Sequence, residues 1–295
     1  MHRPVLLVIA HGSRDPRHAA TVHALVRRVR SLRPELRVET GFLDFNVPSV
    51  PGVLDSLVAE GVRDVVALPL LLTRAFHAKA DIPAVLADAD PRLRIRQADV
   101  LGPSPLLLAA LERRLYEAGL TPADKSSTGV VLASAGSTDP EAIAVIAAIA
   151  REWRHTGWCA VRPAFASASL PRTEDAVREL LALGCERVAV APYVLAPGFL
   201  PDRIARGAAE ADVLADVLGP APEVARVLLE RYDAARVPLP AAVGPEAPTA
   251  GVSSRRSPRS RRTASPGGSR AARPRRYDAT GSCGGRAGRC GPCRR

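Results

Sequence analysis

Two histidines have the side-chain type and the position that suit chemistry. His11 directly follows the apolar segment Val5–Ala10, and His77 follows the apolar segment Val65–Leu72 after a short loop. A neutral imidazole binds divalent transition metals, and its ordinary pKa of about 6.5 makes it a proton acceptor near neutral pH. These two positions therefore point to metal binding, proton transfer, or both.

Both histidines are missing from a second copy of the same sequence pattern. The matched segments are residues 5–16 and 130–140, 68–83 and 191–204, and 100–105 and 217–222. In the second copy, Ala135 and Leu200 occupy the places of His11 and His77, and neither side chain can bind a metal or accept a proton. We therefore predict two homologous halves, residues 1–122 and 129–235, with the chemistry in the first.

Short apolar segments rich in branched residues alternate with amphipathic stretches in both halves. The expected strands are Val5–Ala10, Val38–Leu43, Val65–Leu72 and Leu93–Val100, and then Val130–Ser134, Ala160–Phe165, Arg187–Val194 and Val213–Leu218. The Asp-Pro pairs at 15–16 and 139–140 are typical of helix starts, since aspartate caps free amides and proline suits the first turn. The alternation predicts an α/β fold with two parallel sheets joined by helical crossovers.

In such a sheet, His11 and His77 would follow strands one and three. In the common strand order 2-1-3-4 these strands are neighbours, and ligands bind in the crevice outside their carboxyl ends. With that assumed order, we expect the two histidines to converge. For His2, His18, His23 and His155 we expect no chemical role.

The basic character of the chain belongs to its tail. From Thr249 to Arg295 there are 13 arginines and one acid, Asp278, so this segment has a net charge of +12. The whole chain has a net charge of +11, so the first 248 residues sum to −1. Residues 236–295 are rich in Arg, Pro, Ser and Gly and poor in apolar side chains, which predicts disorder. The net charge therefore says nothing about what the folded part binds.

The five cysteines predict no disulfide framework, because an odd number in an expected cytoplasmic protein argues against one. Cys159 and Cys185 lie in apolar segments, where buried reduced thiols are expected. Cys283, Cys290 and Cys293 offer three thiolates, but their spacing matches no standard iron–sulfur motif and a fourth ligand is missing, so no cluster is expected.

Several classes of protein are excluded by missing patterns. No apolar segment reaches the length of a membrane-spanning helix, so we expect a cytoplasmic protein without a membrane partner. The chain has no phosphate-binding glycine loop, no nucleophile elbow and no paired-histidine metal helix. Nucleotide enzymes, serine hydrolases and zinc proteases are therefore excluded.

The segments VLLVIAHGSRDP, GFLDFNVPSV and LPLLLTRAFHAKADIP resemble the sirohydrochlorin chelatases of the class II chelatase superfamily, and the two copies resemble their long form. The resemblance covers residues 4–235. It implies two flavodoxin-like domains facing each other across a cleft. It also implies insertion of Fe²⁺ toward siroheme, or of Co²⁺ toward cobalamin, into a dianionic tetrapyrrole. We favour Fe²⁺, because siroheme serves general sulfite and nitrite reduction.

The same resemblance implies roles for individual residues. The metal-site histidines of the family correspond to His11 and His77, and a family acid corresponds to Asp44, where glutamate is more usual. Sirohydrochlorin carries many carboxylates, so the neighbouring cations are candidates to bind it, with Ser13 and the amides of the following helix as further donors. These cations are Arg14, Arg74 and Lys79. Phe199 and the Pro197-Gly198 segment are candidates for the opposite wall.

Three alternatives stay open at this point. The alternatives to a ferrochelatase are a cobaltochelatase, a carrier that binds a tetrapyrrole or metal without turnover, and a nucleic-acid-associated protein that acts through its arginine-rich tail. We expect sirohydrochlorin and a divalent metal ion as partners, the metal as substrate, no obligatory cofactor, no specific nucleic acid, and a monomer.

Overall fold

The computed structural model describes residues 3–236, apart from the side chain of His77. Arg236, where the predicted disordered segment begins, ends a helix, and the remainder of that segment lies outside the described residues. The cysteines Cys283, Cys290 and Cys293 lie outside them as well.

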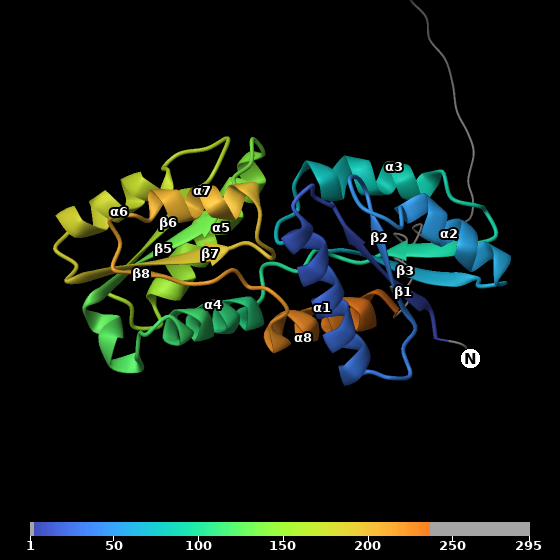
Figure 1. The fold of residues 1–295 in the computed structure, drawn as a ribbon, viewed down its shortest axis with the longest axis horizontal. Helices are drawn as coiled ribbons and strands as arrows, with labels where there is room; N and C mark the ends of the chain where they lie inside the picture. Colours follow the sequence, from blue (N-terminus) through green and yellow to red (C-terminus); the bar gives the residue numbers. More distant parts are fainter. Residues whose placement is uncertain (1–2, 237–295) are drawn as a thin grey trace, which may run out of the picture. The chain divides into compact units, whose positions relative to one another are not determined.

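Two four-stranded parallel sheets form the centre of the fold (Figure 1). The first sheet has the order β2-β1-β3-β4 and the second the order β6-β5-β7-β8. Their strands are β1 (Val5–Ala10), β2 (Val38–Phe42), β3 (Asp64–Pro69) and β4 (Arg94–Gln97), and β5 (Thr128–Ser134), β6 (Ala160–Phe165), β7 (Arg187–Tyr193) and β8 (Val213–Leu214). The α/β class and the assumed strand order 2-1-3-4 are therefore confirmed in both copies.

Helices follow the strands in both copies. In the first half they are α1 (Pro16–Leu32), α2 (Val50–Ala59), the π-helical turn η1 (His77–Asp81), α3 (Ile82–Ala87) and α4 (Pro105–Glu117). After the 3₁₀ turn η2 (Pro122–Ser126) come α5 (Pro140–Arg154), α6 (Thr173–Ala182), α7 (Phe199–Gly207) and α8 (Pro222–Arg236). The predicted helix starts are confirmed, because Asp15 accepts a hydrogen bond from the amide of Arg17 and Asp139 from that of Glu141, both at 2.9 Å.

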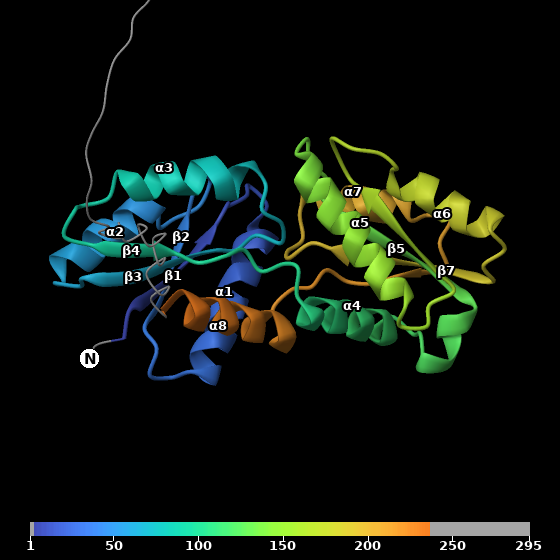
Figure 2. The ribbon, with the colours of Figure 1, turned by 180° about the vertical axis from the view of Figure 1, so that it is seen from behind.

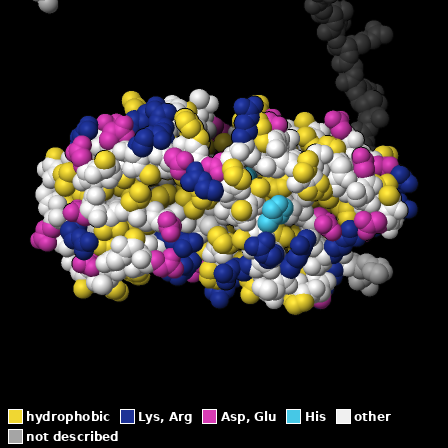
Figure 3. All heavy atoms as spheres, in the orientation of Figure 1, with side chains coloured by type: hydrophobic (Ala, Val, Ile, Leu, Met, Phe, Trp, Pro, Cys, Tyr) yellow, Lys and Arg dark blue, Asp and Glu magenta, His cyan; other side chains and the backbone are white. Residues whose placement is uncertain are grey.

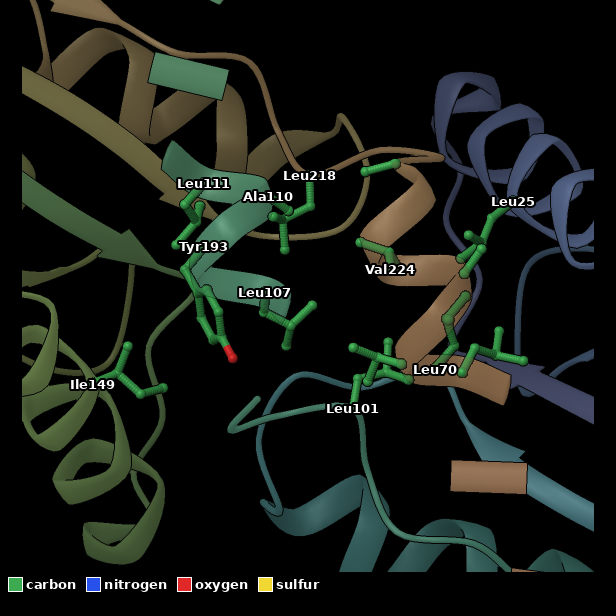
Figure 4. Close-up of a cluster of buried hydrophobic side chains, with 14 of the residues drawn as sticks. Leu25, Leu70, Leu101, Leu107, Ala110, Leu111, Ile149, Tyr193, Leu218 and Val224 are labelled. Atoms are coloured by element: carbon green, nitrogen blue, oxygen red, sulfur yellow. The ribbon is translucent and has the colours of Figure 1, made fainter. Parts of the chain in front are cut away.

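The last helix of each half packs against the other half (Figures 1 and 2). Helix α4 contacts β7 and α8, whereas α8 contacts α1, β3 and β4. Buried side chains from both halves form one continuous core there, as Figure 4 shows for Leu107 and Leu111 of α4, Val224 of α8 and Tyr193 at the end of β7. The boundaries 1–122 and 129–235 stay a prediction about the sequence repeat, since this core crosses them.

The edge strands β4 and β8 are shorter than the sequence suggests. Strand β4 covers Arg94–Gln97 of the expected segment 93–100, and β8 covers only Val213–Leu214 of 213–218. Just after each strand the chain still bonds to the neighbouring strand, Ala98 to Ala67 at 2.8 Å and Ala215 to Val190 at 2.9 Å, and it then leads to α4 and α8. Within residues 3–236, no helix is long and apolar enough to cross a membrane.

Candidate functional site

His11 is the first residue after β1, a strand buried along its whole length. The next residue must be glycine, because Gly12 has a φ of +95° and a Cβ atom on it would lie 1.8 Å from the backbone oxygen of Asp44. The amide of Asp44 in turn donates to the carbonyl of His11 at 2.9 Å. The loops after β1 and β2 therefore lock together and fix the backbone of His11.

The second half repeats this backbone frame without the histidine. Gly136 has a φ of +92° and its Cβ would lie 1.9 Å from the oxygen of Ser167, whose amide donates to the carbonyl of Ala135 at 3.0 Å. The two glycines therefore occupy equivalent places, whereas His11 and Asp44 are replaced by Ala135 and Ser167. Since the frame forms without the imidazole, the fold does not require His11.

A cavity of about 450 Å³ lies between the carboxyl ends of the two sheets. The first half contributes His11, His18, Leu70, Leu71, Leu72, Thr73 and Ala75, and the second contributes Ser134, Ala135, Gly136, Ser137, Ala142, Ile143, Ile146, Phe165, Tyr193, Val194, Leu195, Ala196, Leu200 and Pro201. Most of these side chains are apolar, and the volume lies within the range of small-molecule sites. Ala135 and Leu200, the replacements for the two histidines, are both on the wall.

His11 lies on this wall, with its Nδ1 atom 3.2 Å from the carbonyl oxygen of Gly12. His77 begins the π-helical turn that follows β3, the strand paired with β1. The topology therefore brings both positions to neighbouring strand ends, as expected. The side chain of His77 lies outside what the structure describes, so the pairing of the two imidazoles stays a prediction.

The turn at His77 contains one more residue than its counterpart in the second half. The amide of Lys79 bonds to the carbonyl of Ala75 at 3.1 Å, just as that of Asp202 bonds to Gly198 at 2.9 Å. Ile82 and Ile204, both buried, then follow three and two residues later. An extra residue in a helix produces a π-turn, a feature frequent at functional sites. It distinguishes the half that carries the histidines.

His18 lines the cavity, whereas the sequence analysis expected no chemical role for it. Its ring lines the cavity, and its Nδ1 atom is buried with no hydrogen-bond partner in the described part of the chain. Burial, and then the nearby charge of His11, lower its pKa below the ordinary 6.5, so the neutral ring is favoured. The signal was present: His18 precedes the buried Val22 and Leu25 of α1 by four and seven residues, on the same helix face.

The three predicted cations lie outside the cavity wall. Lys79 donates hydrogen bonds to Asp139 and Glu141 of the second half, both at 2.7 Å, so its ammonium group is already engaged. Arg14 is exposed and lies over the ring of Phe45, 5.2 Å from its centroid. Arg74 is also exposed, with a loose 3.9 Å contact to Asp99.

Ser13 and Asp44 hold the loops around His11. The Ser13 hydroxyl accepts from the amide of Asp15 at 3.1 Å, and the Ser13 amide donates to the Asn46 side chain at 2.8 Å. The Asp44 carboxylate accepts from the amide of Phe45 at 2.8 Å. Both predicted residues therefore lie beside His11, with polar atoms that bond within the loops.

On the opposite wall of the cavity, the residues that follow Phe199 take the place expected for Phe199 itself. The side chain of Phe199 is 71% exposed and does not line the cavity, whereas Leu200 and Pro201 do.

Elsewhere on the surface, Lys and Arg side chains are interspersed with acidic and hydrophobic ones on the face that Figure 3 shows. Among the described residues, no group of three or more His, Cys, Asp and Glu side chains could hold a metal ion.

Comparison with known proteins decides the family. The CbiX family model matches residues 5–118 and 129–235, which together are most of the chain. The chain belongs to the CbiX family. The expected resemblance is therefore confirmed.

Among similar proteins, a sirohydrochlorin cobaltochelatase of Priestia megaterium is 32% identical over 206 residues, 68% of this CbiX-family chain and 66% of that protein. A sirohydrochlorin ferrochelatase of Bacillus subtilis strain 168 is 26% identical over 208 residues, 69% and 78% of the two chains. The chain thus spans about two thirds of the first relative.

Solved structures share the fold. The structure of SirB from Bacillus subtilis with Fe³⁺ has a TM-score of 0.67 and 24% identity, over 80% of this chain and 96% of that one. The structure of CbiX, the terminal enzyme for biosynthesis of siroheme in denitrifying bacteria, has a TM-score of 0.56 and 21% identity, over 79% of this chain and 99% of that one. Two tandem flavodoxin-like domains are thereby confirmed as the architecture.

Proposed function

We propose that this CbiX-family protein is a sirohydrochlorin chelatase that inserts a divalent metal ion into the macrocycle, with Fe²⁺ as the preferred metal and Co²⁺ as the alternative. The observation that carries the proposal is His11, on the wall of an apolar cavity of about 450 Å³ that both halves build. Relatives named for either metal support the reaction class and leave the choice between the metals open.

Metal binding and acceptance of the two pyrrole protons are proposed for His11 and His77, without assigning either role to one of them. Neutral imidazoles suit Fe²⁺ and Co²⁺, and two protein ligands leave coordination positions open for the macrocycle nitrogens. An Nδ1 proton on His11, donated to the carbonyl of Gly12, would keep the lone pair on Nε2 for the metal. The hydrogen bond would also hold the orientation of the ring. An imidazole with a protonated Nδ1 atom can accept a pyrrole proton only on an Nε2 atom that has released the metal to the macrocycle.

The apolar walls suit this reaction, because metal insertion leaves the net charge at the centre of the macrocycle unchanged. The macrocycle loses two protons as the ion with two positive charges enters, so the product carries no additional charge into the cavity. The second half lines the cavity mainly with apolar side chains such as Ala135 and Leu200. Its polar side chains there, those of Ser134, Ser137 and Tyr193, carry only hydroxyl groups, so imidazole nitrogen comes from the first half.

Arg14 and Arg74 are proposed to bind the carboxylates of the substrate, because both are exposed near the histidine-bearing loops. Ser13 and Asp44 are proposed to position His11 through their loop hydrogen bonds. At the edge of the substrate, Ser13 would donate a hydrogen bond and the Asp44 carboxylate would attract the metal ion. Lys79 is proposed to bind substrate only if it leaves Asp139 and Glu141. We further propose that the protein is cytoplasmic, is a monomer and has no resident cofactor.

The test is anaerobic metal insertion followed by the absorbance of sirohydrochlorin, with limiting Fe²⁺ or Co²⁺ and the full chain. We expect insertion faster than the uncatalysed reaction, and faster with Fe²⁺ than with Co²⁺. A higher rate with Co²⁺ would favour a cobaltochelatase. Tight pigment binding at the uncatalysed rate would identify a carrier instead.

A further inference from the structure

Phe45 is the exposed aromatic residue beside His11. Its ring centroid lies 6.3 Å from that of the imidazole, with 31° between the ring planes, and the guanidinium of Arg14 lies 5.2 Å from the same centroid. The side chain is 50% exposed, although burial of a phenylalanine is strongly favourable. An apolar ring is therefore displayed between the proposed metal ligand and a cation.

The backbone at Phe45 is held in a conformation that side chains disfavour. Its φ is +61°, in the left-handed region, which costs a residue with a Cβ atom about 1–2 kcal/mol. The Asp44 carboxylate accepts from the amide of Phe45 at 2.8 Å, and Asn46 is tied to the amide of Ser13 at 2.8 Å. The surrounding loops thus hold the ring at this place without burying it.

The second half provides an internal comparison. Ala168 occupies the equivalent position with a φ of +59°. The next hydrogen bond is also repeated, from Asn46 to Asp44 at 2.7 Å and from Ser169 to Ser167 at 2.6 Å. The loop therefore forms without an aromatic side chain. The ring occurs in the half that carries His11 and is absent where alanine replaces that histidine.

We propose that Phe45 is a substrate-binding residue whose ring packs against the face of a flat conjugated macrocycle, next to the carboxylate that Arg14 binds. This inference rests on the proposed function and deepens it. Aromatic rings pack favourably at centroid separations of about 4.5–7 Å, and an arginine beside the ring suits a substrate with an apolar face and an acidic edge. Phe45 would align the macrocycle relative to His11.

The experiment measures equilibrium binding of metal-free sirohydrochlorin by absorbance and fluorescence, together with kcat and KM. Phe45→Ala should weaken pigment binding and raise KM roughly tenfold, the effect of losing one aromatic contact and its apolar area. Phe45→Trp should retain binding. Leu170→Ala is the matched control, because Leu170 is 72% exposed in the equivalent loop of the second half, and its binding should equal that of wild type.

A second variant separates binding from folding. Phe45→Gly relieves the left-handed backbone, so its unfolding free energy should equal or exceed that of wild type, while its pigment binding falls as in Phe45→Ala. Unchanged pigment binding in both variants would overturn the inference. A wild-type protein that neither binds nor metallates sirohydrochlorin would instead overturn the proposed function.

Discussion

Lys79 of the first half donates hydrogen bonds to Asp139, the N-cap of α5 in the second half, at 2.7 Å. The duplication repeats this relationship with the charges reversed. Asp202, which corresponds to Lys79, accepts from Arg17 of α1 at 2.8 Å, and Arg17 corresponds to Glu141, the second partner of Lys79. Each ion pair joins the segment after the third strand of one half to the first helix of the other.

These pairs predict what happens when Lys79 or Asp202 is changed to alanine. If Lys79 acts by joining the halves, both variants should change the dissociation rate of sirohydrochlorin in the same direction, because each removes one cross-half pair. Solvent reaches both pairs and screens them, so the unfolding free energy should change little in either variant. Opposite effects, with weaker binding for Lys79→Ala and tighter binding for Asp202→Ala, would show that Lys79 binds substrate carboxylates.

Gly12 predicts a large loss of stability on substitution. Gly12→Ala places a Cβ atom 1.8 Å from the Asp44 oxygen, so the loops that position His11 must separate. We expect a loss of more than about 3 kcal/mol in urea unfolding, and the same for Gly136→Ala. Gly61→Ala is the control, since Gly61 has a φ of +80° with open space around it, and should cost only about 1 kcal/mol. Equal losses at Gly12 and Gly61 would contradict this account of the loops.

His18 predicts a pH dependence of stability. Its folded-state pKa is lowered by burial, so the unfolded chain binds a proton more readily, and stability falls as the pH drops through the ordinary pKa of about 6.5. His18→Leu should therefore lose less unfolding free energy than wild type between about pH 7.5 and about pH 5.5. His23→Leu, on the exposed face of the same helix, should keep the wild-type dependence. An unaltered dependence in His18→Leu would exclude His18 as its source.

The α/β class and the place of His11 at the end of the first strand could be predicted, because strand–helix alternation indicates parallel sheets. The order 2-1-3-4 was assumed as the common one and is confirmed. The exchange of α4 and α8 could not be predicted, since an amphipathic helix indicates which face is buried and not which sheet covers it. No chemical role was expected for His18, although it continues the apolar stripe of Val22 and Leu25. The ion pairs of Lys79 with Asp139 and Glu141 depend on how the two halves pack, which no local sequence pattern predicts.

Metal insertion by the histidines of the first half can be tested directly. The direct test is the initial rate of anaerobic metallation of sirohydrochlorin by wild type, His11→Ala, His77→Ala and His23→Ala. We predict that the first two substitutions lower the catalysed rate by at least about a hundredfold, and that His23→Ala, an exposed histidine of α1, leaves it unchanged. A wild-type rate in His11→Ala, with pigment binding intact, would contradict the account.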